Sequence, residues 1–439
     1  MKLYNKLLEN IVLPAGDMVL RTAFMQEIRK WRGYAKLSAD EIVELSRRNL
    51  QDILHHAVDH IPYYQDIKKQ RGNPREWLKS FPILYKKEIN AHIDSLVMVP
   101  KETLVKGTTS GSSGTQVSIY ATPREISVSQ GIQTHWWEWS GYYLGKKLVQ
   151  TGMGRTRGIV KKMKDVLLRT KYVNSFAMYE PEVAQMLSGL SGKSGYTLGG
   201  FPSSLSVFAQ VAEKYGLDDV RFDQAISWGD KLFDQYEENI ERVFGCPVFD
   251  TYGCSEGIMM AAKKDLDYYY IMTPHVHMEI VDDRGNEVPD GQMGHLVLTR
   301  LDRYSMPLIR YHIGDMAVKL PREEYPERRE LNYPLLERVV GRDTDVIKVP
   351  SGKYMTVHFF TSLFRDTPDI VQFRVVQKTP GEIEIEYIAA ESFDPRGLEQ
   401  VENKINARLG EKYPVKWKKV GHIPPTASGK PQIVQSLIR

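Results

Sequence analysis

Residues 224–229, QAISWG, and residues 248–253, VFDTYG, share one pattern, a short apolar run that ends in an aromatic residue and a glycine. Each run has the length and composition of a buried strand followed by a turn. Between them, residues 233–244 have the spacing of a helix that ends at Gly245. Strand, helix and strand in this order predict parallel βα units of an α/β fold, in which ligands bind at the carboxyl ends of the strands.

The pattern continues on both sides of these units. Residues 195–198 resemble a strand and residues 203–215 a helix, and a helix with a capping box is expected from Ser38 to a point before Ile61. From residue 275 to residue 320 the alternation becomes that of β-strands. We predict a large N-terminal domain, residues 1–340, of mixed and parallel sheets flanked by helices, together with a β-subdomain.

A smaller unit follows the large one. Residues 370–376 and 382–388 alternate as strands, and residues 394–409 read as a helix that starts at an Asp-Pro pair. Because 439 residues are too many for one ordinary core, we predict a separate α+β domain at residues 341–439.

Composition excludes several classes of protein. The net charge of +4 is small for this length and gives no case for nucleic-acid binding. Two cysteines, Cys246 and Cys254, are too few for a disulfide framework. Residues 1–10 are interrupted by charge, unlike a secretory signal, and no apolar run is long enough to span a bilayer. We expect a soluble cytoplasmic protein, and a homodimer only because two-fold assemblies are common.

Residues 108–116, TTSGSSGTQ, lie between two apolar, β-branched runs. Glycines permit close backbone approach, so a strand, loop and strand of this composition can present several N–H and O–H donors to one anion, such as a nucleotide triphosphate. Taken alone, the same letters fit a flexible hairpin or linker.

Further segments supply the chemistry that such a loop would need. Tyr252 follows a strand and could stack on a base, and Glu256, four residues later, could coordinate Mg²⁺. Asp315 is suited to accept hydrogen bonds from ribose hydroxyls, and Lys430 lies on a loop of small residues. Each of these residues, considered singly, also fits a structural role.

Together, and in this order, the segments resemble the motifs of the adenylate-forming superfamily, which includes acyl- and aryl-CoA synthetases, peptide-synthetase adenylation domains and luciferases. Within it they resemble the phenylacetate–CoA ligase family, including its relatives associated with capsular polysaccharide genes. Residues 61–64, 81–84 and 200–203 look like non-catalytic landmarks of that branch. The resemblance therefore covers essentially the whole chain.

The resemblance implies a two-step, ATP- and Mg²⁺-dependent reaction, in which a carboxylate forms an acyl-adenylate and CoA then displaces AMP. It implies that Lys430, Glu256 and Thr109 are catalytic, with Glu256 also holding the metal, and that Lys430 acts from a small, mobile C-terminal domain. The implied nucleotide-binding residues are Ser110, Gly111, Ser112, Ser113, Gly114, Thr115, Trp228, Gly229, Asp230, Tyr252, Gly253, Ser255, Asp315 and Arg342.

Two positions depart from the family pattern. The phosphate loop of the superfamily usually ends in a lysine, but Gln116 and Val117 follow Thr115 here, so backbone donors and Mg²⁺ would carry more of the charge. The hinge is usually aspartate or lysine, whereas the alignment places Thr344 there, with Asp345 adjacent.

The acid and its acceptor are less constrained. An aromatic helix at residues 124–144, together with other apolar side chains, suggests an acid pocket for an apolar or aryl acid, although such rings also fit a core. CoA is the expected acceptor; an amine or hydroxyl acceptor, or a catalytically inactive nucleotide-binding homologue, are the alternatives. The pocket residues expected are His135, Trp136, Phe201 and Cys254.

Overall fold

The computed structural model describes residues 3–108, 116–152, 158–174, 179–229, 231–282, 284–339, 347–351, 353–355, 357–364, 367, 369–391, 393–424 and 433–438. The chain forms two compact units. Unit 1 comprises Met1–Thr109, Val117–Leu144 and Thr251–Gly341, and unit 2 comprises Ser110–Gln116, Gly145–Asp250 and Arg342–Arg439. Strand β7 (Val248–Gly253) contributes its first half to unit 2 and its second half to unit 1.

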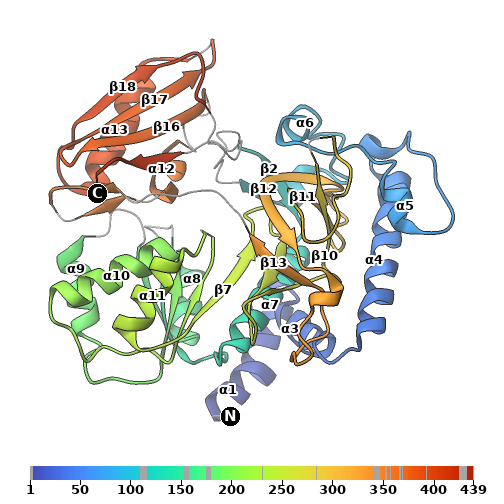
Figure 1. The fold of residues 1–439 in the computed structure, drawn as a ribbon, viewed down its shortest axis with the longest axis horizontal. Coiled ribbons are helices and arrows are strands. Elements are labelled where there is room, and N and C mark those ends of the chain that lie inside the picture. Colours follow the sequence, from blue (N-terminus) through green and yellow to red (C-terminus); the bar gives the residue numbers. More distant parts are fainter. Residues whose placement is uncertain are drawn as a thin grey trace. The chain divides into compact units, whose positions relative to one another are not determined.

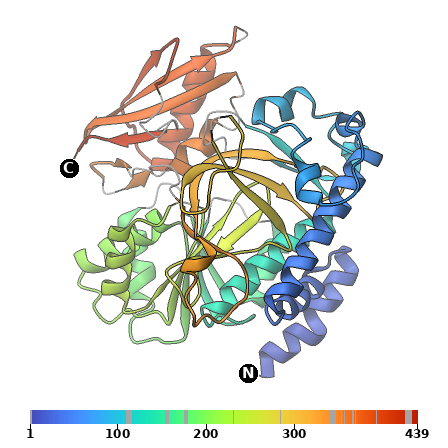
Figure 2. The ribbon, with the colours of Figure 1, turned by 45° about the vertical axis from the view of Figure 1, so that its right-hand side comes forward.

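Unit 1 starts with helices, of which α4 (Ala39–His60) forms one long rod (Figures 1 and 2). The Ser38 hydroxyl accepts a hydrogen bond from the Glu41 N–H, and the Glu41 carboxylate accepts one from the Ser38 N–H at 2.8 Å. The predicted capping box is therefore confirmed. The other helices before α7 are α1 (Leu3–Leu7), η1 (Leu8–Val12), α2 (Leu13–Leu20), α3 (Phe24–Tyr34), η2 (Pro62–Tyr64), α5 (Pro74–Leu78), α6 (Lys86–Ala91) and η3 (Lys101–Thr103).

Helix α7 (Pro123–Trp139) is the aromatic helix expected from the sequence. The helix opens with a capping box between Thr122 and Glu125, and Pro123 stands in its first turn. It ends five residues earlier than predicted, because the chain turns at Gly141, whose φ of 90° lies outside the helical region.

The strands of unit 1 form antiparallel ladders. Their order is β10-β11-β12-β13-β9-β8-β7, so neighbours in the sheet are often far apart in the sequence. A separate antiparallel pair, β1 (Val105–Thr108) and β2 (Ser118–Ala121), flanks residues 109–116 and confirms the strands predicted there. The remaining bounds are β8 (Met259–Ala262), β9 (Tyr269–Ile271), β10 (Val276–Val281), β11 (Met293–Arg300), β12 (Tyr311–Lys319) and β13 (Leu335–Val339), with η4 at Arg322–Glu324.

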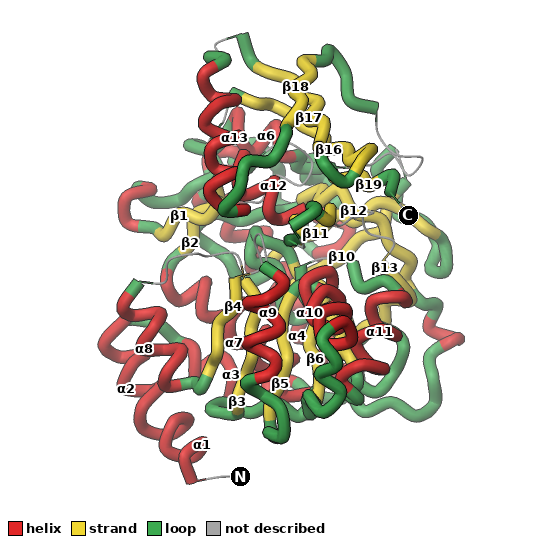
Figure 3. Tube along the Cα trace, turned by 90° about the vertical axis from the view of Figure 1, so that its left-hand side faces the viewer, coloured by secondary structure: helices red, strands yellow, loops and turns green. Residues whose placement is uncertain are grey.

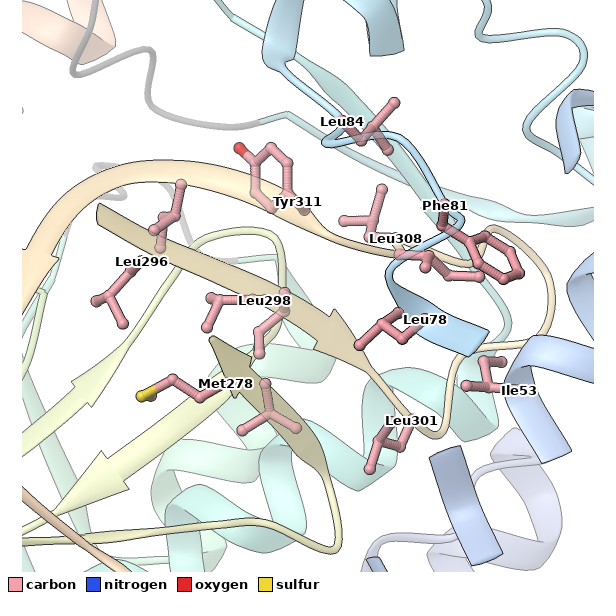
Figure 4. Packing of buried hydrophobic residues seen from close by; sticks show 14 of the residues in the cluster. Ile53, Leu78, Phe81, Leu84, Met278, Leu296, Leu298, Leu301, Leu308 and Tyr311 are labelled. Atoms are coloured by element: carbon pink, nitrogen blue, oxygen red, sulfur yellow. The ribbon is translucent and has the colours of Figure 1, made fainter. Parts of the chain in front are cut away.

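A buried apolar cluster joins these strands to the helices of unit 1 (Figure 4). Leu298 of β11 and Met278 of β10 pack in the same cluster as Ile53 of α4 and Leu78 of α5. Tyr311, at the first position of β12, also belongs to it and has no exposed surface. The start of β12 is therefore fixed by the core.

Unit 2 contains the parallel strands (Figure 3). Their order is β7-β6-β5-β3-β4, and every adjacent pair is parallel, which confirms the predicted βα arrangement. Apolar residues of α9, α10 and α11 pack on these strands in one cluster. The bounds are β3 (Lys147–Gly152), α8 (Ile159–Leu167), β4 (Thr170–Asn174), α9 (Glu180–Ser188), β5 (Tyr196–Gly200), α10 (Pro202–Lys214), β6 (Gln224–Ser227) and α11 (Asp234–Phe244).

The C-terminal residues form an α+β structure with a core of their own. The sheet order is β18-β17-β16-β19, in which β16 and β17 are antiparallel and the outer pairs are parallel. The predicted boundary after residue 340 lies outside the described residues. The elements are β14 (Ile347–Lys348), β15 (Tyr354–Met355), α12 (Val357–Phe364), β16 (Ile370–Thr379), β17 (Glu382–Ala389), α13 (Arg396–Leu409), β18 (Val415–Lys419) and β19 (Val434–Ser436).

Candidate functional site

The turn that follows β7 carries Glu256. The Cys254 N–H donates to the Ile258 carbonyl at 3.0 Å, and the Gly257 N–H donates to the Cys254 carbonyl at 2.9 Å, so the chain reverses directly into β8. Gly257 has a φ of 78°, a conformation that glycine adopts without strain. Glu256 is buried, with 4% of its surface exposed. The turn thus holds a carboxylate inside unit 1.

Both oxygens of Glu256 have defined donors. Tyr311 Oη donates to Oε1 at 2.6 Å, and Ser255 Oγ donates to Oε2 at 3.3 Å. Tyr311 is held by the apolar cluster, where its hydroxyl points away from Leu308 (Figure 4). Neutral hydroxyl donors orient a carboxylate without cancelling its charge.

The carboxylate of Glu256 is a suitable ligand for Mg²⁺. This ion is commonly held by one or two carboxylates together with substrate phosphates, rather than by a full protein cage. Within the described residues no group of three or more His, Cys, Asp or Glu side chains could hold a metal.

Tyr252 and Asp315 meet across unit 1. The Tyr252 hydroxyl donates to Asp315 Oδ2 at 2.7 Å, although 63 residues separate them in the sequence. Tyr252 lies on β7 and Asp315 on β12. Two residues assigned to one nucleotide from separate motifs are therefore neighbours, and Gly253 and Ser255 lie on the same segment as Tyr252.

Another group of predicted residues lies at the carboxyl ends of β5 and β6 in unit 2. The Trp228 N–H donates to the Gly200 carbonyl at 3.1 Å. Gly229 has a φ of 83°, and a Cβ there would lie 2.5 Å from the Phe201 ring. Trp228, Gly229 and Phe201 therefore lie together where parallel strands usually bind ligands.

The two α7 candidates are engaged in packing and hydrogen bonding. Trp139 Nε1 donates to His135 Nε2 at 3.2 Å, so His135 carries its proton on Nδ1, which faces Glu138 at 3.3 Å. Trp136 belongs to a buried apolar cluster. Burial first, and the Glu256 carboxylate second, raise the pKa of the Cys254 thiol, which therefore stays neutral. A role of His135, Trp136 and Cys254 in an acid pocket stays a prediction.

Several predicted residues lie outside the described residues, and their roles stay predictions. They include the catalytic residues Thr109 and Lys430. The others are Ser110, Gly111, Ser112, Ser113, Gly114, Thr115, Asp230, Arg342, Thr344 and Asp345.

Sequence reasoning missed a buried network behind the Glu256 turn. Arg300 Nη1 donates to the Gly257 carbonyl at 2.8 Å, and Arg300 Nε donates to Asp302 Oδ1 at 2.8 Å. Asp302 Oδ2 lies 2.5 Å from His275 Nδ1, and the Met259 N–H donates to His275 Nε2 at 3.1 Å. The network therefore anchors the turn on both sides of Ile258.

The positive charge of Arg300 is paired with the negative charge of Asp302 in this network. His275 accepts at Nε2, so its proton is on Nδ1, where it donates to Asp302. Burial would raise the pKa of Asp302, but His275 and Arg300 hold it well below its usual value. Burial lowers the pKa of His275, against the opposing effect of Asp302. No motif spacing would have predicted this arrangement.

Comparison with family models gives two matches. Residues 156–300 match the model described as AMP-binding enzyme, and residues 347–436 match the model described as CapK C-terminal domain. Protein CapK of Staphylococcus aureus is 22% identical over 425 residues, which cover 93% of this chain and 91% of CapK. Phenylacetate-coenzyme A ligase of Pseudomonas putida is 25% identical over 338 residues, 71% of this chain and 72% of the ligase.

Solved structures confirm the fold. A crystal structure of 2-hydroxyisobutyryl-CoA ligase with 2-HIB-AMP and CoA, in the thioesterification state, has a TM-score of 0.62 and 19% sequence identity. The match covers 92% of each chain. The structure of the same ligase with 2-HIB-AMP in the postadenylation state has a TM-score of 0.58, with 92% and 91% of the two chains covered. The mixed α/β architecture with a separate C-terminal domain is thus shared with adenylate-forming ligases.

Proposed function

The chain belongs to the adenylate-forming superfamily, with phenylacetate–CoA ligase-like relatives that include protein CapK, and on this premise we propose that it activates a carboxylic acid with ATP and transfers the acyl group to CoA. One observation carries the proposal. Tyr252 and Asp315, assigned to the adenine and the ribose of one nucleotide, are joined by a hydrogen bond of 2.7 Å. Glu256 lies four residues beyond Tyr252, on the turn that follows β7.

In the first step, a carboxylate oxygen of the acid attacks the α-phosphorus of ATP. The bond to the bridging oxygen between the α- and β-phosphates breaks, and pyrophosphate leaves. Tyr252 and Asp315 would orient the nucleoside, and the carboxylate of Glu256, held by Tyr311, would face the metal-bound phosphates. Mg²⁺, when bound, would neutralise charge on the phosphates.

Residues known from sequence alone complete the proposed site. The backbone and hydroxyl donors from Ser110 to Thr115 would hold the β- and γ-phosphates, since no lysine follows that loop. Lys430 would bridge the acid and the α-phosphate. We propose that it acts from a mobile domain of residues 341–439, which pivots at Thr344 or Asp345.

In the second step, the sulfur of CoA attacks the acyl carbon, the acyl–phosphate bond breaks, AMP leaves, and the thiol proton passes to solvent. A second candidate is transfer to an amine or hydroxyl group. Protein CapK covers 93% of the chain and the phenylacetate-coenzyme A ligase of Pseudomonas putida covers 71%, so the CoA acceptor of the ligase is not the only one to test. Both candidates share the first step, and both suit a cytoplasmic protein, as a monomer or a homodimer.

The test is a screen of carboxylic acids for pyrophosphate release and for ATP–pyrophosphate exchange, with and without CoA. We expect exchange with one class of acid, and release of AMP that depends on CoA. Lys430→Ala and Glu256→Gln should each reduce exchange by at least about 100-fold, as loss of a group that stabilises transition-state charge does. The control Lys412→Ala changes an exposed lysine and should leave exchange unaltered.

The outcomes separate the hypotheses. Exchange that persists in Lys430→Ala would remove this lysine from the adenylation step. Exchange with AMP release that needs an amine or a hydroxyl compound instead of CoA would select the second candidate. ATP binding without exchange across the acid panel would identify an inactive nucleotide-binding homologue.

A further inference from the structure

Arg303, on the loop between β11 and β12, is a buried cation that forms no ion pair with any described residue. Only 3% of its surface is exposed, and its Nε and Nη1 atoms have no hydrogen-bond partner among the described residues. Burial first, and the charge of Arg300 second, lower the pKa of Arg303 to about 9, so it remains charged at neutral pH. A buried charge is costly unless it is paired, so this side chain is conspicuous.

Two carboxylates, those of Glu125 and Asp302, act electrostatically on Arg303, but each already accepts hydrogen bonds from other residues. The carboxylate of Glu125 accepts the N–H groups of Tyr304 and Ser305 at 2.8 and 2.9 Å, and the Ser305 hydroxyl at 2.5 Å. Asp302 is bound by His275 and Arg300. These two carboxylates attract Arg303 at a distance without forming an ion pair with it.

Arg300 shows how a buried guanidinium is satisfied in the same region. It has no exposed surface, and its nitrogen atoms donate to Asp302, to the Gly257 carbonyl and to the Glu125 carbonyl, each at 2.8 Å. Arg300 uses these three acceptors, whereas Nε and Nη1 of Arg303 have no partner among the described residues. The contrast indicates that Arg303 serves an acceptor other than those of the described residues.

The guanidinium lies against the Glu256 turn. A Cβ on Gly257 would lie 2.8 Å from Arg303 Nη2, 3.1 Å from Arg300 Nη1 and 3.3 Å from Ser129 Oγ, so these polar groups pack directly against the turn. The Cys254 thiol is among the groups that act electrostatically on Arg303. Cys254 is also the residue of this turn that was predicted to border the acid pocket.

We propose that Arg303 binds a second carboxylate on the acid substrate, so that the acids this protein activates best are dicarboxylic. The inference rests on the proposed function, because it names the class of acid that the ligase would accept. A carboxylate supplies both the counter-charge and the hydrogen-bond acceptors that the guanidinium lacks, and arginine binds carboxylates more specifically than lysine does. An apolar or aryl monocarboxylate would leave the buried charge unpaired.

The experiment compares matched acids with one and two carboxylates, such as butanoate with succinate and phenylacetate with 4-carboxyphenylacetate. Pyrophosphate release gives kcat/KM for the wild-type protein, Arg303→Met and Arg303→Lys. We expect the wild type to favour the dicarboxylate of a pair by about 100-fold or more, the range for a buried charge-assisted pair. Arg303→Met should abolish this preference, measured as the ratio of the two kcat/KM values, and Arg303→Lys should restore part of it.

A binding measurement keeps the inference testable apart from turnover. Without nucleotide, the thermal midpoint of Arg303→Met should be at least that of the wild type, because an unpaired buried charge is replaced by an apolar side chain. Succinate should raise the midpoint of the wild type and of the control Arg322→Met, which changes an exposed arginine, but not that of Arg303→Met.

Each result has a separate meaning. Equal kcat/KM for the two acids of every pair in the wild type would overturn the inference and leave the ligase intact. No pyrophosphate release from any acid, together with a midpoint shift that depends on Arg303, would refute the ligase and retain the anion site. A lower midpoint for Arg303→Met without ligand would mean that Arg303 is paired within the fold, which also overturns the inference.

Discussion

Replacing Tyr311 with phenylalanine tests how the fold holds Glu256. The substitution removes one oxygen atom and keeps the ring in the apolar cluster. The bond that is lost is an O–H···O contact of 2.6 Å between a residue with no exposed surface and a carboxylate that is 4% exposed. Hydrogen bonds to charged groups contribute about 1.5–3 kcal/mol, so we expect the unfolding free energy to fall by that amount.

Tyr333 provides a matched control. It is also fully buried, but its hydroxyl has no hydrogen-bond partner among the described residues. Tyr333→Phe removes an unsatisfied polar group, and its unfolding free energy should be unchanged or higher. The two variants delete the same atom from the same residue type. Only Tyr311→Phe should lower the unfolding free energy, because only the Tyr311 hydroxyl has a hydrogen-bond partner among the described residues.

Urea unfolding monitored by tryptophan fluorescence measures both variants, with equal m-values as the condition for comparison. The exchange assay, run as a Mg²⁺ titration, then reports on Glu256: Tyr311→Phe should need more Mg²⁺ for half-maximal exchange, and Tyr333→Phe should not. Equal stabilities and equal Mg²⁺ requirements in the two variants would refute the reasoning that Tyr311 orients this carboxylate.

Three further perturbations follow from the site. Tyr252→Phe removes the bond to Asp315 at a partly exposed position, and we expect about a tenfold rise in the KM for ATP in the exchange assay; an unchanged KM would separate this bond from nucleotide binding. The pKa of His275 is lower in the folded protein, so the unfolded chain binds the extra proton and stability falls as pH drops below about 6.5, by up to about 1.4 kcal/mol per pH unit. His275→Gln should flatten that slope in urea unfolding between pH 7 and 5, and identical slopes would argue against a neutral buried His275. Gly257→Ala forces a side chain at a φ of 78° within 2.8 Å of Arg303, and should lower the unfolding free energy by more than about 1 kcal/mol, whereas Gly16→Ala, with nothing within 4 Å, should not.

The parts of the fold that follow from local sequence were predictable. The helix from Ala39 carries its own start signal in Ser38 and Glu41, and the apolar runs at residues 224–227 and 248–253 are strands. The strand Lys147–Gly152 was not predicted, although it pairs on both sides in the parallel sheet. A strand identified by its two neighbours depends on contacts that its own letters do not specify.

The site divides in the same way. Glu256, Tyr252 and Asp315 were recognisable as motif residues, but the hydrogen bond from Tyr311 to Glu256 spans 55 residues. It depends on the sheet order β7-β8-β9-β13-β12, which does not follow the sequence. Arg303 was equally hidden, because an arginine without a counter-charge has no signature in a sequence and is recognised only when its neighbours have been assigned their own partners.

The hydrogen bonds that hold the Glu256 turn are separate from the side chain of Arg303, so the position of Glu256 and the proposed choice of acid can change independently. The Gly257 carbonyl accepts hydrogen bonds from Arg300 and Ser129, and the Met259 N–H donates to His275, so the Glu256 carboxylate keeps its position through bonds that do not involve Arg303. Under the proposed function, substitutions at position 303 would alter which acid is accepted and leave the hydrogen bonds that hold Glu256 unchanged. A lineage could thereby acquire new substrates by single substitutions, without passing through an inactive ancestor.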